Sequence, residues 1–91
     1  MEIYFSAQIN KDLKKIYKKD KELAIKIKKQ ISRFKQNPKY PSLRIHKLSG
    51  KLNNMWSLTV TENIRMIYLL QDEDKAYFVD IGTHDEVYKS N

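Results

Sequence analysis

The sequence has no cysteine, and only two glycines, two prolines and one tryptophan among its 91 residues. Without cysteine there is no disulfide framework and no metal site built from thiolates. No glycine-rich phosphate loop and no His/Asp metal cluster appears, so we expect no cofactor. The longest apolar run, residues 66–70, is far shorter than the roughly 20 residues that span a bilayer. The first residues do not read as a signal peptide, so we expect a soluble cytoplasmic protein without a membrane partner.

Positive charge is abundant and unevenly placed. The net charge is +7, and residues 1–51 carry 15 Lys and Arg against 4 Asp and Glu, whereas residues 52–91 carry 3 against 7. A basic half beside a mildly acidic half indicates one surface suited to phosphate, although lysine-rich helices are also common as plain solvated faces. The length allows one hydrophobic core, so residues 1–91 are expected to form a single domain.

Apolar residues recur at helical spacing in two adjoining segments. Ser6 and Asp20 precede the segments as candidate N-caps, and Asn37 and Pro38 end the second one. The pattern predicts two amphipathic helices joined as a hairpin. The stripes are Ile9, Leu13, Ile16 and Tyr17 in the first segment and Leu23, Ile27, Ile31 and Phe34 in the second.

Short segments of alternating or apolar character predict strands on both sides of the hairpin. They cover residues 2–5, a weak candidate at 43–48, and residues 55–61, 64–70 and 76–81. The segments between them, residues 49–54 and 71–75, are rich in turn-forming or charged residues. The predicted order is β-α-α-β-β-β-β. We therefore expect an α+β fold in which an N-terminal helical hairpin packs on a mostly antiparallel sheet.

Several local motifs recur in this order along nearly the whole chain. They are FS before a lysine-rich helix (residues 5–6), YPSLRIHKLSG (40–50), WSL (56–58), IRMIY (64–68) and IGTHDEVY (81–88). Together they resemble the RelE/ParE superfamily of bacterial type II toxin–antitoxin toxins, and most closely the YafQ-like and StbE-like branch. Asn63 and Asp80 depart from that branch, which has an acidic group at the first position and an arginine near the second.

The resemblance implies four site residues. His84 matches the C-terminal catalytic histidine, His46 a second functional histidine, Arg65 the arginine near the scissile phosphate, and Tyr88 an aromatic residue near the C-terminus. Histidine suits acid or base catalysis because it titrates near neutral pH, and arginine can clamp a phosphate in bidentate fashion.

Each of these residues also has a structural interpretation. His84 can be a turn or capping residue, His46 a strand residue that points to water, and Tyr88 a packing residue. Arg65 can form an ion pair with Asp80 or Glu62. Trp56, Met66 and Phe34 are better interpreted as core.

Basic side chains outside these motifs are candidate contacts to the RNA backbone. Such contacts depend on salt and are indifferent to sequence. The candidates are Lys47, Arg44, Lys14, Lys18 and Lys28.

The resemblance implies a toxin that cleaves messenger RNA on the 70S ribosome without a metal, with a cognate antitoxin as its protein partner. Two alternatives remain open: a ParE-like inhibitor of DNA gyrase, and a catalytically weak homologue that mainly binds antitoxin.

Overall fold

The computed structural model describes residues 1–48 and 54–89, with side chains as far as Val87. The segment from residue 6 to residue 37 forms two helices, α1 (Ala7–Lys19) and α2 (Lys21–Gln36). The Ser6 hydroxyl and the Asp20 carboxylate each accept a hydrogen bond from a main-chain N–H in the first turn of the helix that follows, at 3.1 and 3.0 Å. Both predicted caps and the predicted helical hairpin are confirmed.

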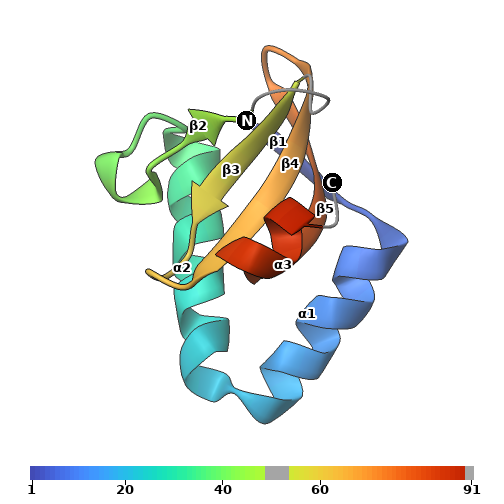
Figure 1. Cartoon of the computed structure of the whole chain (residues 1–91). Coiled ribbons are helices and arrows are strands. Elements are labelled where there is room, and N and C mark those ends of the chain that lie inside the picture. Colours follow the sequence, from blue (N-terminus) through green and yellow to red (C-terminus); the bar gives the residue numbers. More distant parts are fainter. Residues whose placement is uncertain (49–53, 90–91) are drawn as a thin grey trace.

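The described residues form a five-stranded mixed sheet in the order β1-β5-β4-β3-β2 (Figure 1). The first strand is parallel to the last, and the other neighbours are antiparallel. The predicted α+β fold is therefore confirmed. The strands are β1 (Glu2–Phe5), β2 (His46–Lys47), β3 (Met55–Thr59), β4 (Ile64–Asp72) and β5 (Lys75–Thr83).

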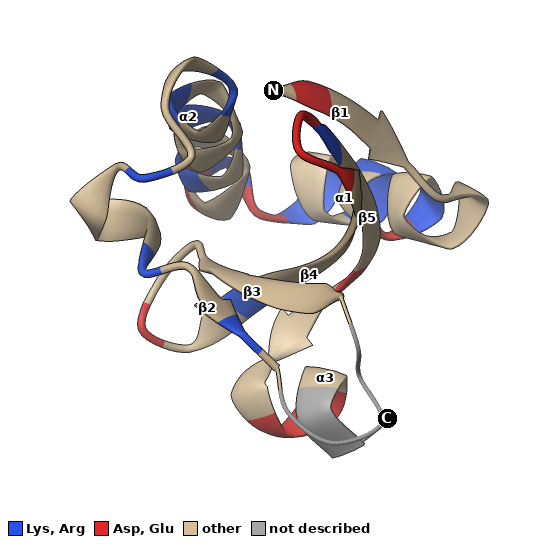
Figure 2. Ribbon diagram, turned by 90° about the horizontal axis from the view of Figure 1, so that it is seen from above, with Lys and Arg blue, Asp and Glu red and all other residues tan. Residues whose placement is uncertain are grey.

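The two faces of the sheet carry different helices. α1 and α2 cover one face, and a short helix, α3 (His84–Lys89), lies against the other (Figure 2). The main core lies under the hairpin and contains fully buried Ile27, Met66 and Phe78. A smaller cluster of Leu48, Ile67 and Val87 fixes α3 to the opposite face.

Phe34 of α2 lies at the centre of an aromatic cluster. Its ring centroid lies 5.0 Å from that of Tyr68 and 5.6 Å from that of Phe78, and the last two rings are 5.1 Å apart. Tilted and edge-on pairs at such distances add to the free energy of simple area burial. Burial also raises the pKa of the Tyr68 hydroxyl, since the interior disfavours the phenolate. Phe34 and Met66 are core residues, as predicted.

Gln30 is the polar exception in the apolar stripe of α2. Its side-chain amide is buried and donates to the carbonyl oxygens of Ser42, at 3.2 Å, and Thr59, at 2.8 Å. Its own oxygen accepts from Arg33 at 3.2 Å. Gln30 thus ties α2 to the segment before β2 and to the end of β3. Gln30 lies three residues after Ile27 and four before Phe34, so the spacing places it on the buried face of the helix. A polar residue at such a position is the sequence signal for a buried hydrogen bond.

The strand predicted over residues 43–48 is largely wrong. Pro41–Leu43 forms a single turn of 3-10 helix, η1, and Arg44 follows with a left-handed φ of 45°. The pairing with β3 is confined to His46 and Lys47. Proline cannot donate to a strand ladder, and the turn lets Leu43 enter the core, where it is fully buried. The turn predicted after this strand lies almost wholly outside the described residues.

We predict that Phe34→Ala lowers the free energy of unfolding by about 3–5 kcal/mol, because it leaves a cavity against Tyr68 and Phe78. Urea denaturation followed by circular dichroism measures the change. Ile25→Ala is the matched control on the same helix, because Ile25 is 67% exposed. Its effect should stay within about 0.5 kcal/mol. Equal losses in the two variants would contradict the central place given to Phe34.

Candidate functional site

His84 is the first residue of α3 and directly follows β5. Its side chain is 62% exposed, and its Nδ1 lies 3.8 Å from a carboxylate oxygen of Asp85, an ion pair when the imidazole is protonated. The sequence therefore placed His84 correctly, just past the end of a central strand. The helix that begins there was missed. An exposed imidazole anchored to a rigid sheet is well placed to exchange protons with a bound substrate.

A reciprocal capping box fixes the start of α3. The Thr83 N–H donates to the Glu86 carboxylate at 2.8 Å, and the Glu86 N–H donates to the Thr83 hydroxyl at 3.2 Å. The backbone N–H of Thr83, followed by its side chain, lowers the pKa of the Glu86 carboxyl. The Thr-x-x-Glu spacing is the sequence signal that would have predicted this helix.

Gly82 allows α3 to fold closely over the end of β5. A Cβ atom at this position would lie 3.2 Å from Glu86 Oε1 and 3.3 Å from Glu86 Cβ. Both distances are shorter than an ordinary van der Waals contact, and the next residue, Val87, is buried in the cluster under α3. The absence of a side chain at Gly82 therefore helps to set the position of His84, two residues further along.

Arg65 lies on β4 directly opposite Gly82 on β5 and Thr59 on β3. Directly opposed residues share a face of the sheet, so Arg65 lies on the face that carries α3. Its Nη1 donates to the main-chain carbonyls of Thr61 and Ile64. These described contacts of the guanidinium are to carbonyls rather than to carboxylates. They fix its direction while its positive charge stays available to an anion.

Arg44 and Arg65 line one open hollow of about 430 Å³ at the ends of β3 and β4. The sequence proposed both arginines for contacts to phosphate, and the structure brings them together. A pair of guanidinium groups around one hollow favours an anionic group, whereas the carboxylate of Glu62 in the same lining opposes it. The lining residues are Ser42, Arg44, Thr59, Thr61, Glu62 and Arg65.

The structure does not bring His46 and His84 into contact. His46 lies on β2 opposite Ser57, in a row that continues to Ile67 and Asp80 on the face of α3. Three strand spacings separate β2 from β5, or about 14 Å. His46 is exposed, but beside it Ser57 is fully buried and its hydroxyl has no hydrogen-bond partner among the described residues.

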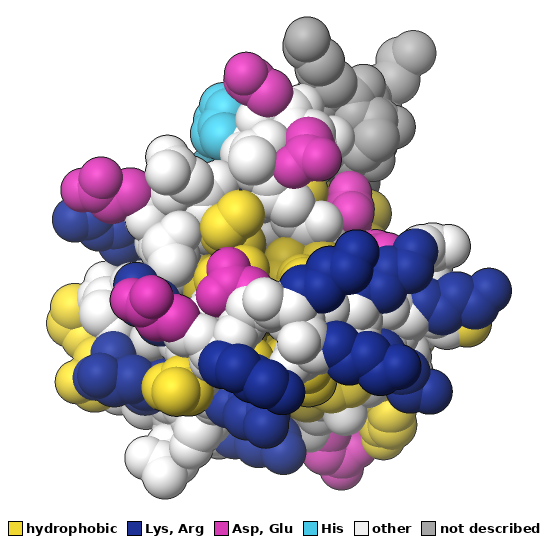
Figure 3. Space-filling view, turned by 90° about the horizontal axis from the view of Figure 1, so that it is seen from below, with side chains coloured by type: hydrophobic (Ala, Val, Ile, Leu, Met, Phe, Trp, Pro, Cys, Tyr) yellow, Lys and Arg dark blue, Asp and Glu magenta, His cyan; other side chains and the backbone are white. Residues whose placement is uncertain are grey.

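The remaining predicted RNA contacts lie elsewhere. Lys47 adjoins His46 but points to the opposite face, because neighbouring strand residues alternate. Lys14 and Lys18 on α1 and Lys28 on α2 belong to the helical layer, where Lys28 lies 4.9 Å from the ring centre of Tyr17. Figure 3 shows lysine and arginine side chains gathered over the helices. The backbone of Tyr88 belongs to α3, and its side chain lies outside what the structure describes.

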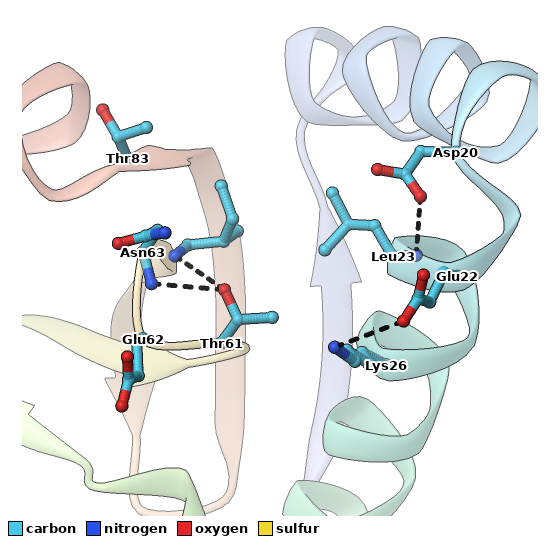
Figure 4. A pocket seen from close by; sticks show the side chains of 9 residues that line it. Asp20, Glu22, Leu23, Lys26, Thr61, Glu62, Asn63 and Thr83 are labelled. Atoms are coloured by element: carbon cyan, nitrogen blue, oxygen red, sulfur yellow. Dashed lines mark hydrogen bonds and ion pairs between the residues drawn. The ribbon is translucent and has the colours of Figure 1, made fainter.

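Another hollow, of about 700 Å³, lies between the tip of the helical hairpin and the β3–β4 turn (Figure 4). Its walls include Asp20 and Lys26 from the hairpin, Glu62 from the β3–β4 turn and Thr83 from the end of β5. The mixture of charges gives it no single ligand preference. Across the described residues, no group of three His, Asp or Glu side chains is placed to hold a metal ion.

No helix among the described residues is long and apolar enough to cross a bilayer.

Solved structures of bacterial toxins share this architecture. A YoeB/ParE toxin from Agrobacterium tumefaciens superposes with a TM-score of 0.78 at 19% identity, covering 92% of this chain and 99% of that one. YafQ from E. coli strain BL21(DE3) gives 0.77 at 24%, with 96% and 97% covered. The YoeB–YefM toxin–antitoxin heterotetramer from Staphylococcus aureus gives 0.76 at 22%, with 92% and 97% covered. At these identities the likeness shows the fold.

The fold is thus that of toxins from type II toxin–antitoxin systems. The family model for the bacterial type II toxin YafQ matches residues 1–89, and the chain belongs to this family. The resemblance drawn from the sequence motifs is confirmed. A search of curated protein sequences found no match.

We predict that the capping box stabilises the protein at neutral pH and stops doing so in acid. The pKa of Glu86 in the folded state lies below its ordinary value of 4.5. The contribution is therefore fully present above about pH 4.5 and is lost as the pH falls through the folded-state value. Glu86→Gln should lower the free energy of unfolding at pH 7, and its difference from wild type should shrink toward about pH 2.

Denaturation curves at several pH values measure this difference. Glu73→Gln, at the exposed β4–β5 turn, controls for the loss of one negative charge. A difference between wild type and Glu86→Gln that does not change with pH would refute the proposed role of the carboxylate.

Proposed function

We propose that this toxin is an endoribonuclease that cleaves messenger RNA on the ribosome without a metal ion. The observation that carries the proposal is the position of His84, an exposed imidazole at the capped start of α3, two residues beyond the partner of Arg65 in the sheet. The family to which the chain belongs supports it. The resemblance to the YafQ-like branch implies cleavage of messenger RNA in the ribosomal A site.

In the proposed reaction the ribose 2′-oxygen attacks the adjacent phosphorus. A base removes the 2′-OH proton, the bond from phosphorus to the 5′-oxygen breaks, and an acid protonates that leaving oxygen. The products are a 2′,3′-cyclic phosphate and a 5′-hydroxyl end. His84 takes one of the two proton-transfer roles, and His46 shares in proton transfer.

Arg65 has the electrostatic role. Its guanidinium stabilises the negative charge that accumulates on the phosphorane. The carbonyls of Thr61 and Ile64 hold it in place before the substrate arrives, so little reorganisation accompanies the reaction. Tyr88 positions the target base.

The separation of the two histidines supports the proposed dependence on the ribosome. Side chains on β2 and beyond β5 do not assemble one compact acid–base pair in the free protein. A ribosome that holds the messenger in a fixed path supplies the missing orientation, and correct orientation alone lowers reaction barriers by several kcal/mol. Lys14, Lys18 and Lys28 contact ribosomal RNA through its backbone, as their helical surface is basic.

A cognate antitoxin completes the proposed system. Similar folds have been solved together with antitoxins, as in the E. coli DinJ–YafQ complex, which superposes with a TM-score of 0.73 at 24% identity. An antitoxin segment that is acidic in part suits a chain of net charge +7.

Primer extension on a messenger RNA in a purified translation reaction tests the nuclease. We predict discrete cuts at the A-site codon with wild type and ribosomes, and none when ribosomes are omitted. His84→Ala should reduce the cleavage rate by about 10²–10⁴, the usual contribution of one positioned acid or base. Glu73→Gln, an exposed change at the β4–β5 turn, is the control that should cut as wild type does.

Circular dichroism should show the same fold in both variants. Full cleavage by His84→Ala would overturn the role of this residue. Intact messenger with the wild-type protein would instead favour a gyrase inhibitor or a homologue that mainly binds antitoxin.

A further inference from the structure

Arg44 belongs to the lining of two hollows. One is the hollow that it shares with Arg65. The other, of about 370 Å³, is lined by Pro38, Lys39, Tyr40, Pro41, Arg44 and Ile45. The first hollow offers two guanidinium groups and hydroxyls, whereas the second offers prolines, an aromatic ring and an aliphatic side chain. A hollow suited to an anion thus adjoins a largely apolar one, whose lining also includes Lys39.

The position of Arg44 is built into the fold. The residue has a left-handed φ of 45°, directly after the η1 turn, and its N–H donates to the Pro41 carbonyl at 3.1 Å. A left-handed conformation is uncommon for a residue other than glycine and persists where the surroundings enforce it. Here Leu43 is fully buried immediately before Arg44. The Arg44 backbone is therefore held on the rim of both hollows.

Gln30 of α2 links the segment that carries Arg44 to β3. It bonds the carbonyls of Ser42, two residues before Arg44, and of Thr59, which lies opposite Arg65. One buried amide thus connects the segment that carries Arg44 to the strand beside Arg65. Gln30 acts as a positioning residue, since it holds the two arginine-bearing segments in a fixed relation without reaching the ligand.

Tyr40 provides the aromatic surface of the second hollow. It is 39% exposed, and the Arg33 guanidinium lies 4.7 Å from its ring centre. Arg33 also donates to the Ser42 hydroxyl at 3.1 Å. The ring is therefore held by the network that holds η1, while part of it remains open to a partner. Every nucleobase has a π-face that stacks on such a ring.

We propose that these two hollows form a subsite for one nucleotide of a single strand. Its phosphate lies between Arg44 and Arg65, and its base stacks on Tyr40 against the adjoining prolines. The inference deepens the proposed function, on which it rests, by placing Arg44 beside Arg65 at the reacting phosphate and by adding a base contact at Tyr40. Glu62 lines the phosphate hollow, and its carboxylate limits affinity there.

Binding of a short DNA strand tests the subsite separately from cleavage, since DNA lacks the 2′-hydroxyl that the reaction needs. The probes are fluorescein-labelled tetradeoxythymidylate and an abasic strand with the same four phosphates, measured by fluorescence anisotropy over a range of salt concentrations. Arg44→Ala should weaken both probes and lower the slope of log affinity against log salt by about 0.7. Tyr40→Ala should weaken only the base-bearing probe, about five-fold or more.

Two further variants test the supporting contacts. Gln30→Leu keeps the bulk of the side chain but not its hydrogen bonds, and it should weaken both probes although both arginines remain. Glu62→Gln should strengthen both. Circular dichroism and urea denaturation establish that each variant is folded. If Gln30→Leu does not fold, Arg44→Lys serves instead: it keeps the charge without the guanidinium fork and should bind less tightly than wild type.

Lys11→Ala is the matched control, because it removes the same charge from the helical face. Equal salt slopes for Arg44→Ala and Lys11→Ala would overturn the phosphate half of the subsite. Equal weakening of both probes by Tyr40→Ala would overturn the base half. Normal probe binding by a protein that leaves messenger intact on ribosomes would refute the nuclease proposal alone.

Discussion

The packing of Phe34 on Tyr68 and Phe78 is the interaction on which the rest of this structure depends. It fixes the second helix of the hairpin against the two central strands, with ring centroids 5.0 and 5.6 Å apart. One face of the sheet is thereby closed. The opposite face is left to a much smaller helix, and this asymmetry creates the site. The thin covering leaves His84 exposed and Arg65 beside an open hollow, whereas a second full helical layer would bury them.

The same asymmetry separates two kinds of positive charge. The lysines of α1 and α2 lie on the helical layer, whereas Arg44 and Arg65 converge at the ends of β3 and β4. Lysines on flexible stems interact with a phosphate backbone at modest geometric precision, which suits general attraction to RNA. The Arg65 guanidinium is held by main-chain carbonyls, and the backbone of Arg44 is fixed by the η1 turn. Such fixed positions suit oriented contact with one phosphate. The two kinds of positive charge thus lie in different parts of the molecule.

A capping box, a glycine and a buried side-chain amide hold the candidate site in place. The capping box between Thr83 and Glu86 sets the first turn of α3, and Gly82 lets that turn approach β5. At the other end, the buried amide of Gln30 links η1 to β3. The capping box and the Gln30 amide each pair main-chain groups that would otherwise lack a protein partner. The geometry of the site therefore depends on residues that need not contact RNA.

Sequence periodicity was sufficient for the larger elements. Apolar spacing predicts the helical hairpin and the order of the main strands along the chain. Ser6 and Asp20 predict the two helix caps. All of these signals are local in the sequence. The error at residues 43–48 arose where alternation was outweighed by Pro41 and by the burial of Leu43. The helix that begins at His84 was missed, although its Thr-x-x-Glu spacing is visible in the sequence.

The sequence by itself determined the helical hairpin, the strand segments, the charge asymmetry and the position of His84 after a strand. Only the tertiary structure decided which of these residues meet. It brought Arg44 and Arg65 to the lining of one hollow and kept His46 apart from His84. It also placed Lys14, Lys18 and Lys28 on the helical layer. The physical reason is that periodicity reports which face of an element is apolar, whereas neighbours across a sheet are set by strand order and register, which depend on contacts between residues distant in the chain.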